Sequence, residues 1–154
     1  MKTHPVQLKG KGLKIGIVQS RFSNGIGEEL LNACVKKLVK REVKENNIIL
    51  VTVPGALEIP IALQNLLMSD NFDAMIALGV VIRGETYHFE LVSDISARGI
   101  SRVSLDFNVP IVNMVLTTEN DEQAIVRAKI RGLEAADVAV EMANHIKNLR
   151  KYKK

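Results

Sequence analysis

The sequence predicts an α/β fold in which helices cover both faces of a parallel sheet, giving a three-layer α/β/α sandwich with four main strands. Short apolar runs alternate with helical patterns along the 154 residues. The links between them are short, which indicates right-handed βαβ crossovers. With 47% hydrophobic residues, the chain can bury a sizeable core, and we expect a single domain over residues 1–154.

The first half of the chain predicts two strands and two helices. The strands are Leu13–Val18 and Ile48–Val53. Between them, one face of a helix carries Ile26, Leu30, Cys34 and Leu38. The second helix follows a turn at Pro54 and Gly55, and Pro60 is tolerated in its first turn.

The second half continues the alternation. We expect a third strand at Met75–Ile82, a helix from about Tyr87 to Ile100, and a fourth strand at Pro110–Leu116. Two further helices are predicted, one from Glu119 and one from about Leu133 to Arg150.

The N-terminal segment VQLKG predicts a short extra strand, which would lie at an edge of the sheet because Pro5 and lysines flank it. We expect such a strand to be able to pair with a neighbouring subunit.

Composition argues against several classes of protein. The net charge of +4 owes much to the tail 148–154, which is typical of a solvated helix end. With no Trp and few other aromatic residues, nucleic-acid binding is not expected. Cys34 is the only cysteine, so we expect a buried core thiol rather than a disulfide. Neither a signal peptide nor an apolar run of about 18 residues is visible, which predicts a cytoplasmic protein without membrane contact.

Common cofactor motifs are also missing. The segment GIGEEL at 25–30 matches only part of a dinucleotide fingerprint, and no GxxxxGK[ST] loop is present. His, Cys and carboxylate residues show no metal-ligand spacing. We therefore expect neither a cofactor nor a metal.

The segment GVVIRGETYHF at 79–89 is the strongest functional signal, because it runs from a buried strand through a glycine turn to a histidine. Ligands of parallel α/β sheets bind at the carboxyl ends of strands, and a helix start offers N–H groups to an anion. Thr86 can cap the helix. His88 is therefore the histidine in a plausible catalytic position.

Three other residues have both an ordinary and a functional interpretation. Phe22, in a polar loop after the first strand, either packs on the core or stacks on a flat heterocycle. Glu58 is either a partner of the helix dipole or a ligand contact. Arg127 is either a surface side chain or the counter-charge of a phosphate.

The segments KIGIVQSRFS, VPGALEIP, ALGVVIRGETYHFELVS and VLTTENDEQA occur in one order and span nearly the whole chain. In their residues and spacing they resemble the 6,7-dimethyl-8-ribityllumazine synthase family. The resemblance implies a flavodoxin-like sheet and condensation of 5-amino-6-(D-ribitylamino)uracil with 3,4-dihydroxy-2-butanone 4-phosphate, without a cofactor. It also implies sites between neighbouring subunits, which favours a homopentamer.

The same resemblance assigns roles to residues. His88 matches the proton-transfer residue. The ribitylaminouracil site would comprise Phe22, Ala56, Leu57, Glu58, Val80, Val81, Ile82 and Asn113. The butanone phosphate would contact Glu85, Thr86 and Arg127, with Arg127 coming from a neighbouring subunit. Glu85 would contribute only its backbone amide.

The chain departs from the usual family pattern in three places. Ser23 stands where Asn is usual, and Asn113 and Met114 stand where many members have Phe and Gly. The usual glycine- and lysine-rich loop between the last two helices is shortened in RAKIRGLEAA at 127–136, where Arg131 takes the place of a lysine. Ser23 and Arg131 are thus additional candidate contacts, and the shortened loop leaves assembly beyond a pentamer open.

Two alternatives use the same fold. One is a non-catalytic lumazine or flavin binder, against which Thr86, His88 and Arg127 argue, because a pure binder needs no phosphate site beside a proton shuttle. The other is a flavodoxin-like electron carrier, which fold alone does not distinguish.

Overall fold

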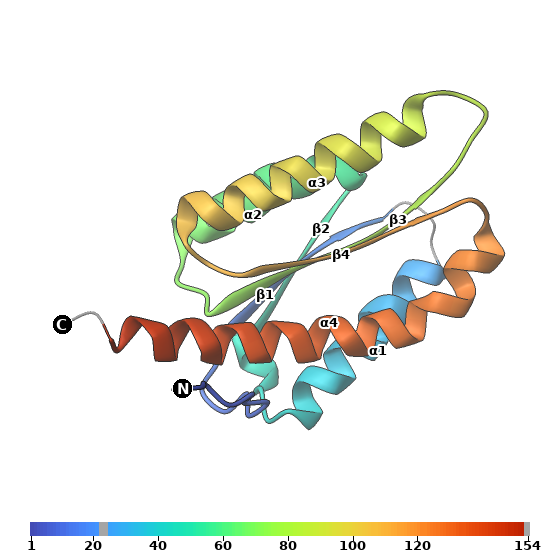
Figure 1. Cartoon of the computed structure of the whole chain (residues 1–154). Helices are drawn as coiled ribbons and strands as arrows, with labels where there is room; N and C mark the ends of the chain where they lie inside the picture. Colours follow the sequence, from blue (N-terminus) through green and yellow to red (C-terminus); the bar gives the residue numbers. More distant parts are fainter. Residues whose placement is uncertain (22–24, 153–154) are drawn as a thin grey trace.

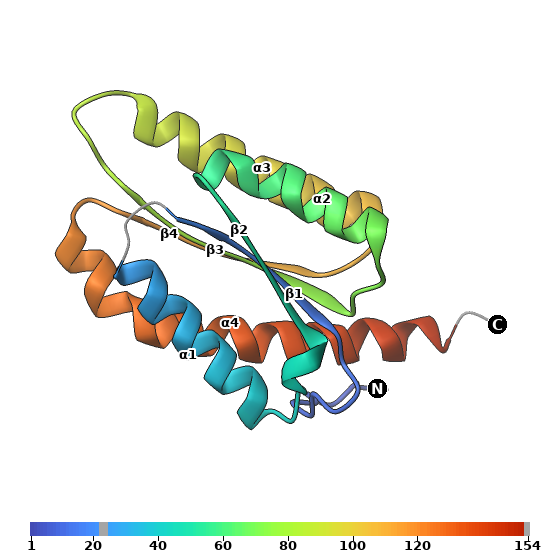
Figure 2. The ribbon, with the colours of Figure 1, turned by 180° about the vertical axis from the view of Figure 1, so that it is seen from behind.

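The computed structural model describes residues 1–21 and 25–152 and confirms the α/β fold (Figures 1 and 2). Its strands are β1 (Ile15–Ser20), β2 (Ile48–Val53), β3 (Ala74–Ile82) and β4 (Ile111–Thr118). Its helices are α1 (Ile26–Lys40), α2 (Ile59–Ser69), α3 (His88–Phe107) and α4 (Asp121–Arg150). Two single 3-10 turns, η1 (Glu45–Asn47) and η2 (Ala56–Glu58), precede β2 and α2.

The four strands form a parallel sheet in the order β2-β1-β3-β4. Figures 1 and 2 show α1 and α4 on one face and α2 and α3 on the other. The chain moves from β1 outward to β2 and then crosses back to β3, so the direction of winding reverses between β1 and β3. Ligands of such sheets bind outside the carboxyl ends of the strands at this switch point.

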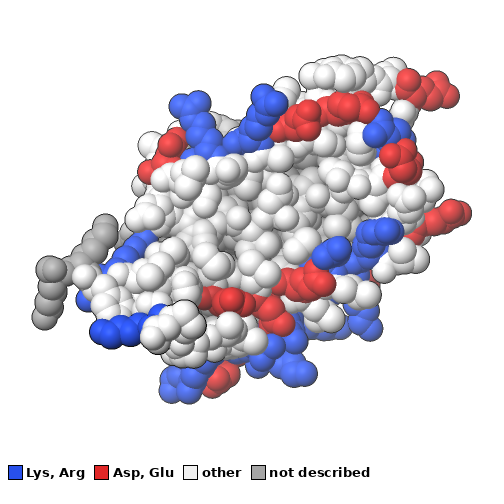
Figure 3. Space-filling model, in the orientation of Figure 1, with Lys and Arg blue, Asp and Glu red and all other residues white. Residues whose placement is uncertain are grey.

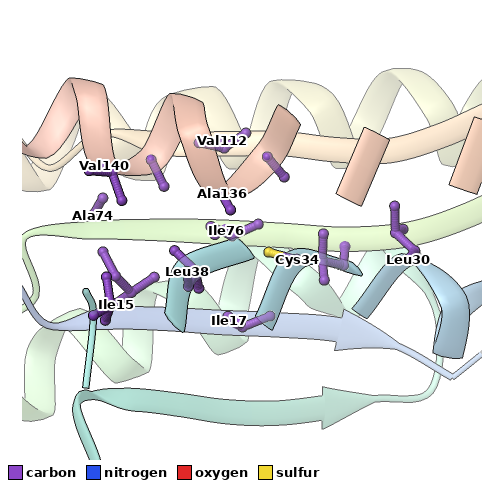
Figure 4. Close-up of a cluster of buried hydrophobic side chains, with 14 of the residues drawn as sticks. Ile15, Ile17, Leu30, Cys34, Leu38, Ala74, Ile76, Val112, Ala136 and Val140 are labelled. Carbon is purple, nitrogen blue, oxygen red and sulfur yellow. The ribbon is translucent and has the colours of Figure 1, made fainter. Parts of the chain in front are cut away.

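The two sides of the sheet bury separate clusters of apolar side chains. On the side of α1 and α4, Ile17, Ile76 and Cys34 lie in one cluster (Figure 4). Burial raises the pKa of the Cys34 thiol to about 12, which agrees with the predicted inert core cysteine. On the other side, Ile59 and Val81 lie in the cluster beneath α2 and α3.

The prediction of two helices in the last third of the chain is wrong, because α4 continues without a break from Asp121 to Arg150. The expected interruption lay near Gly132, which instead sits at the contact with α1. A Cβ atom there would overlap the carbonyl oxygen of Leu30 and lie 2.8 Å from the Cβ of Ala33. The glycine thus permits close approach of two helices rather than a turn.

The ends of other helices and strands differ from the predicted ones by a few residues. α3 extends beyond the predicted Ile100 to Phe107, and Asn108 ends it in the left-handed conformation (φ 53°, ψ 41°). The helix had no earlier reason to stop, since Pro110 is the first residue that cannot continue it. β1 begins at Ile15 and β4 at Ile111, each slightly later than predicted.

The N-terminal segment has no strand within residues 1–14 of this chain. The side-chain amide of Asn144 in α4 donates hydrogen bonds to the carbonyl oxygens of Gln7 and Lys9, each at 3.0 Å. The segment therefore lies along α4, and its pairing with a neighbouring subunit stays a prediction.

We expect Gly132→Ala to destabilise the protein, although Ala is the better helix former. The helix propensity of Ala would stabilise by about 1 kcal/mol, whereas overpacking against the α1 backbone costs about 1–3 kcal/mol. Denaturant unfolding should show a lower free energy of unfolding than for Lys129→Ala, a control at an exposed site of the same helix. A more stable Gly132→Ala protein would contradict the close packing of α1 on α4.

Candidate functional site

A cleft of about 320 Å³ opens at the carboxyl ends of the strands, on the side of the sheet that α2 and α3 cover. Three chain segments meet there: η2 with the glycine before it, the end of β3, and the loop that leads into α3. The lining residues are Gly55, Ala56, Leu57, Glu58, Val80, Val81, Ile82, Gly84, Thr86, His88, Phe89 and Val92. The cleft thus joins the two loops that sequence analysis singled out after the second and third strands.

The end of β3 forms the floor of the cleft through both main chain and side chain. Val81 belongs to the cluster beneath α2 and α3, on the cleft side. Val80 and Ile82 point to the opposite face, where they pack in the other cluster. Because strand side chains alternate, Val80 and Ile82 border the cleft with their main chain. Peptide groups beside an apolar floor suit a flat ligand with polar edges.

The wall opposite α3 is the turn η2. Gly55 is extended (φ −152°, ψ 176°), and its carbonyl oxygen accepts a hydrogen bond of 3.2 Å from the backbone N–H of Glu58. Ala56 is buried and anchors the turn in the core, whereas Leu57 and Glu58 are exposed. The Glu58 carboxylate lies back over Gly55, 3.0 Å from where a Cβ atom of that residue would be. The turn therefore presents an apolar and an acidic side chain to the cleft.

The third side of the cleft is the N-terminus of α3. His88 is the first residue of that helix, and its backbone N–H donates to the Thr86 hydroxyl at 3.4 Å. One helical turn of α3 adds Phe89 and Val92 to the lining. The helix N-terminus carries partial positive charge and therefore favours an anion. The imidazole of His88 and the hydroxyl of Thr86 lie beside it.

Arg83, the first residue after β3, forms ion pairs beside the cleft. Its guanidinium pairs with the carboxylates of Glu90 and Glu119. Hydrogen bonds to these two carboxylates raise the pKa of Arg83, and the bond to Arg83 lowers the pKa of Glu90. Arg83 and Glu90 are therefore ionised at neutral pH.

Several predicted site residues lie away from the cleft of their own chain. Glu85 is exposed and does not line it, although both its neighbours do. Arg127 lies on the exposed side of α4, where its guanidinium donates to the carbonyl oxygen of Gln123 at 2.8 Å. Arg131 pairs with Glu134 at 2.5 Å on the same helix.

Asn113 lies on the edge strand β4, also outside the cleft. It is exposed, and its side-chain oxygen accepts a 3.0 Å hydrogen bond from the backbone N–H of Val115. The predicted contacts of Phe22 and Ser23 fall outside the described residues.

Gly84, Phe89 and Val92 also line the cleft, and no site role was predicted for them from the sequence. Phe89 and Val92 stand three apart on the inward face of α3, and helical periodicity across FELVSDI was the signal that could have found them. Gly84 has open space around its Cα and follows Arg83 directly, which leaves room for a ligand near the backbone.

Two further findings concern the described part of the chain, residues 1–21 and 25–152. No three His, Cys, Asp or Glu side chains there gather closely enough to hold a metal ion. Nor does any helix in those ranges combine the length and the apolar character needed to cross a membrane.

Comparison with known proteins gives one consistent result. Residues 12–147 match the model of a family described as 6,7-dimethyl-8-ribityllumazine synthase. A protein of that name from Neisseria meningitidis is 61% identical over 144 residues, which cover 94% of this chain and 91% of the relative. One from Burkholderia multivorans is 63% identical over 137 residues, covering 89% and 80%.

Proposed function

The chain belongs to the 6,7-dimethyl-8-ribityllumazine synthase family, and we propose that it condenses 5-amino-6-(D-ribitylamino)uracil with 3,4-dihydroxy-2-butanone 4-phosphate in riboflavin biosynthesis. The observation that carries the proposal is the cleft, in which an apolar floor edged by peptide groups adjoins a histidine at a helix N-terminus. We also propose that residues 1–154 form one domain. We propose a cytoplasmic location because the family consists of metabolic enzymes.

The proposed reaction consists of two condensations with an elimination between them. The aromatic amine attacks the butanone carbonyl, and water leaves to give an imine. Inorganic phosphate is then eliminated, and the ribityl-bearing amine closes the ring with loss of a second water. Each step moves a proton near neutral pH, where an imidazole with an ordinary pKa of about 6.5 can both accept and donate it. His88, at the rim of the cleft, is proposed for this role.

The uracil ring is proposed to lie between η2 and the end of β3. Main-chain groups of Val80 and Ile82 are available to the polar edges of the ring, and Glu58 can accept hydrogen bonds from ribityl hydroxyls. Phe22 would stack on the ring. No cofactor is required, because the chemistry consists of proton transfers and loss of two waters and phosphate.

The phosphate of the second substrate is proposed to bind at the N-terminus of α3, near Thr86. Backbone N–H groups and the helix dipole favour an anion there. The cationic partner in this scheme is Arg127 of a neighbouring subunit, because α4 lies on the opposite face of the sheet from α2 and α3 (Figure 1). Arg131 of the same helix is a further candidate contact.

We propose a homo-oligomer because the site is divided between subunits, and the family resemblance favours a pentamer. Figure 3 shows an uncharged band between the charged side chains along α3 and α4, on the face that carries the β4 edge. β4 contains no charged residue, and unprotected sheet edges favour association. On α4, Ile125, Val126 and Ile130 are exposed close to Arg127. Such apolar patches mark contact surfaces.

The proposed function is tested by mixing the protein with both substrates and following lumazine formation by absorbance and fluorescence. We expect formation well above the spontaneous rate. His88→Ala should slow turnover by roughly 10²-fold, the lower end for loss of one general acid–base group. Residual acceleration should remain because the cleft still orients both substrates. Complete loss of activity in a folded His88→Ala variant would contradict a contribution from orientation of the substrates alone. No acceleration by the unaltered protein would favour a ligand-binding role.

Arg127→Ala should weaken binding of the butanone phosphate. A hydrogen bond to a charged group contributes about 1.5–3 kcal/mol, so the KM for this substrate should rise roughly 10- to 100-fold, whereas the KM for the ribitylaminouracil should change little. Arg127→Lys should lie between, because lysine keeps the charge without the planar fork. Lys129→Ala, exposed on the same helix, is the matched control. An equal rise in both KM values would count against a phosphate contact.

A further inference from the structure

Arg83 stands where three segments of the chain meet. Its Nη1 pairs with Oε1 of Glu90, in the first turn of α3. Its Nε lies 2.8 Å from Oε2 of Glu119, between β4 and α4. Its guanidinium carbon lies 4.3 Å from the centre of the Phe89 ring, within cation–π range. One side chain therefore contacts the start of α3 and the end of β4.

The partners of Arg83 are themselves held in place. The backbone N–H of Glu119 donates to the side chain of Gln123 at 3.0 Å, in the first turn of α4. Glu90 belongs to the first turn of α3. The backbone N–H of Arg83 donates to the carbonyl oxygen of Thr118 at 2.9 Å, which continues the β3–β4 ladder past its last strand pair. The network thus links the first turns of two helices through the sheet.

An exposed ion pair is usually weak, but this arrangement differs from an ordinary one. The Arg83 side chain is 38% exposed, and it binds two carboxylates from separate elements while stacking on an aromatic ring. A planar guanidinium can do all three at once, whereas a lysine cannot. By contrast, Arg102 is 83% exposed and pairs with Asp106 inside α3 alone, so that pair joins no two elements.

The network bears on the site because one of its members, Phe89, also lines the cleft. The neighbouring His88 begins α3 with its backbone N–H donating to the Thr86 hydroxyl at 3.4 Å. Arg83 itself does not line the cleft. Arg83 therefore contacts Phe89, a residue that lines the cleft, from outside the cleft itself.

We propose that Arg83 is a positioning residue that fixes the first turn of α3, with His88 and Phe89, over the ends of β3 and β4. The inference rests on the proposed function for its kinetic consequences. Loss of the guanidinium would leave His88 present but poorly placed, while η2 would remain intact. Turnover should suffer more than binding of the ribitylaminouracil.

The test compares Arg83→Met, Arg83→Lys and the control Arg102→Met in the full-length assembled protein, after the unaltered protein has been shown to form lumazine. Misplacement by about 1 Å can cost roughly 10²-fold, so kcat of Arg83→Met should fall about 10- to 100-fold. The KM for the ribitylaminouracil should stay within about threefold. Arg83→Lys should recover only part of the loss, and Arg102→Met should keep kcat within about twofold.

A double-mutant cycle separates positioning from general stability. Glu119→Gln should lower kcat in the unaltered protein but have little further effect beside Arg83→Met, because one contact is then already lost. Amide hydrogen exchange of residues 84–92 should speed up in Arg83→Met and not in Arg102→Met, a readout that does not depend on activity.

The proposal is overturned if Arg83→Met keeps kcat within about twofold of the unaltered protein, or if the two substitutions act independently. Should Arg83→Met fail to fold, Arg83→Lys and Glu119→Gln carry the same test, since each keeps part of the network. An unaltered protein that forms no lumazine would instead overturn the proposed function, and hydrogen exchange alone would then decide whether Arg83 holds the start of α3.

Discussion

The site depends on the complete burial of β3. All of its residues except Ile82 are buried, because helices pack on both faces of the sheet and β1 and β4 flank the strand. A polar side chain on such a strand needs a hydrogen-bond partner inside the core, and β3 carries no polar side chain. On this segment polar side chains therefore begin only after Ile82, at residues 83–88, and Glu58 of η2 adds a carboxylate from the other wall of the cleft. These side chains meet at the carboxyl edge of the sheet, where the cleft opens.

The same constraint separates the two parts of the proposed site. α4 packs with α1 on one face of the sheet, while the cleft opens on the other. Arg127 on α4 is exposed and does not line the cleft of its own chain. An uncharged edge strand and exposed apolar residues on α4 favour a neighbouring copy as the source of that cation. In this account, assembly completes the site rather than merely stabilising the subunit.

Much of this arrangement could be predicted from the sequence, because apolar runs identify buried strands and strand ends in a parallel sheet converge. The loops after β2 and β3 were predicted for that reason. The failures have tertiary causes. Two helices were predicted after β4, but α4 continues through Gly132, where the close approach of α1 requires a glycine that local patterns do not reveal. The contacts of Arg83 with Glu90 and Glu119 exist only once three elements have packed together.

The most direct test of a site shared between subunits is complementation. A cleft variant carrying Thr86→Val and His88→Ala would be co-assembled in equal amounts with Arg127→Ala, and lumazine formation would be measured at low butanone phosphate. If each site takes its cleft from one subunit and Arg127 from the next, about a quarter of the sites in a randomly mixed ring regain both parts, and activity rises well above that of either variant alone. Activity equal to the average of the two separately assembled variants would contradict the account and place the whole site within one chain.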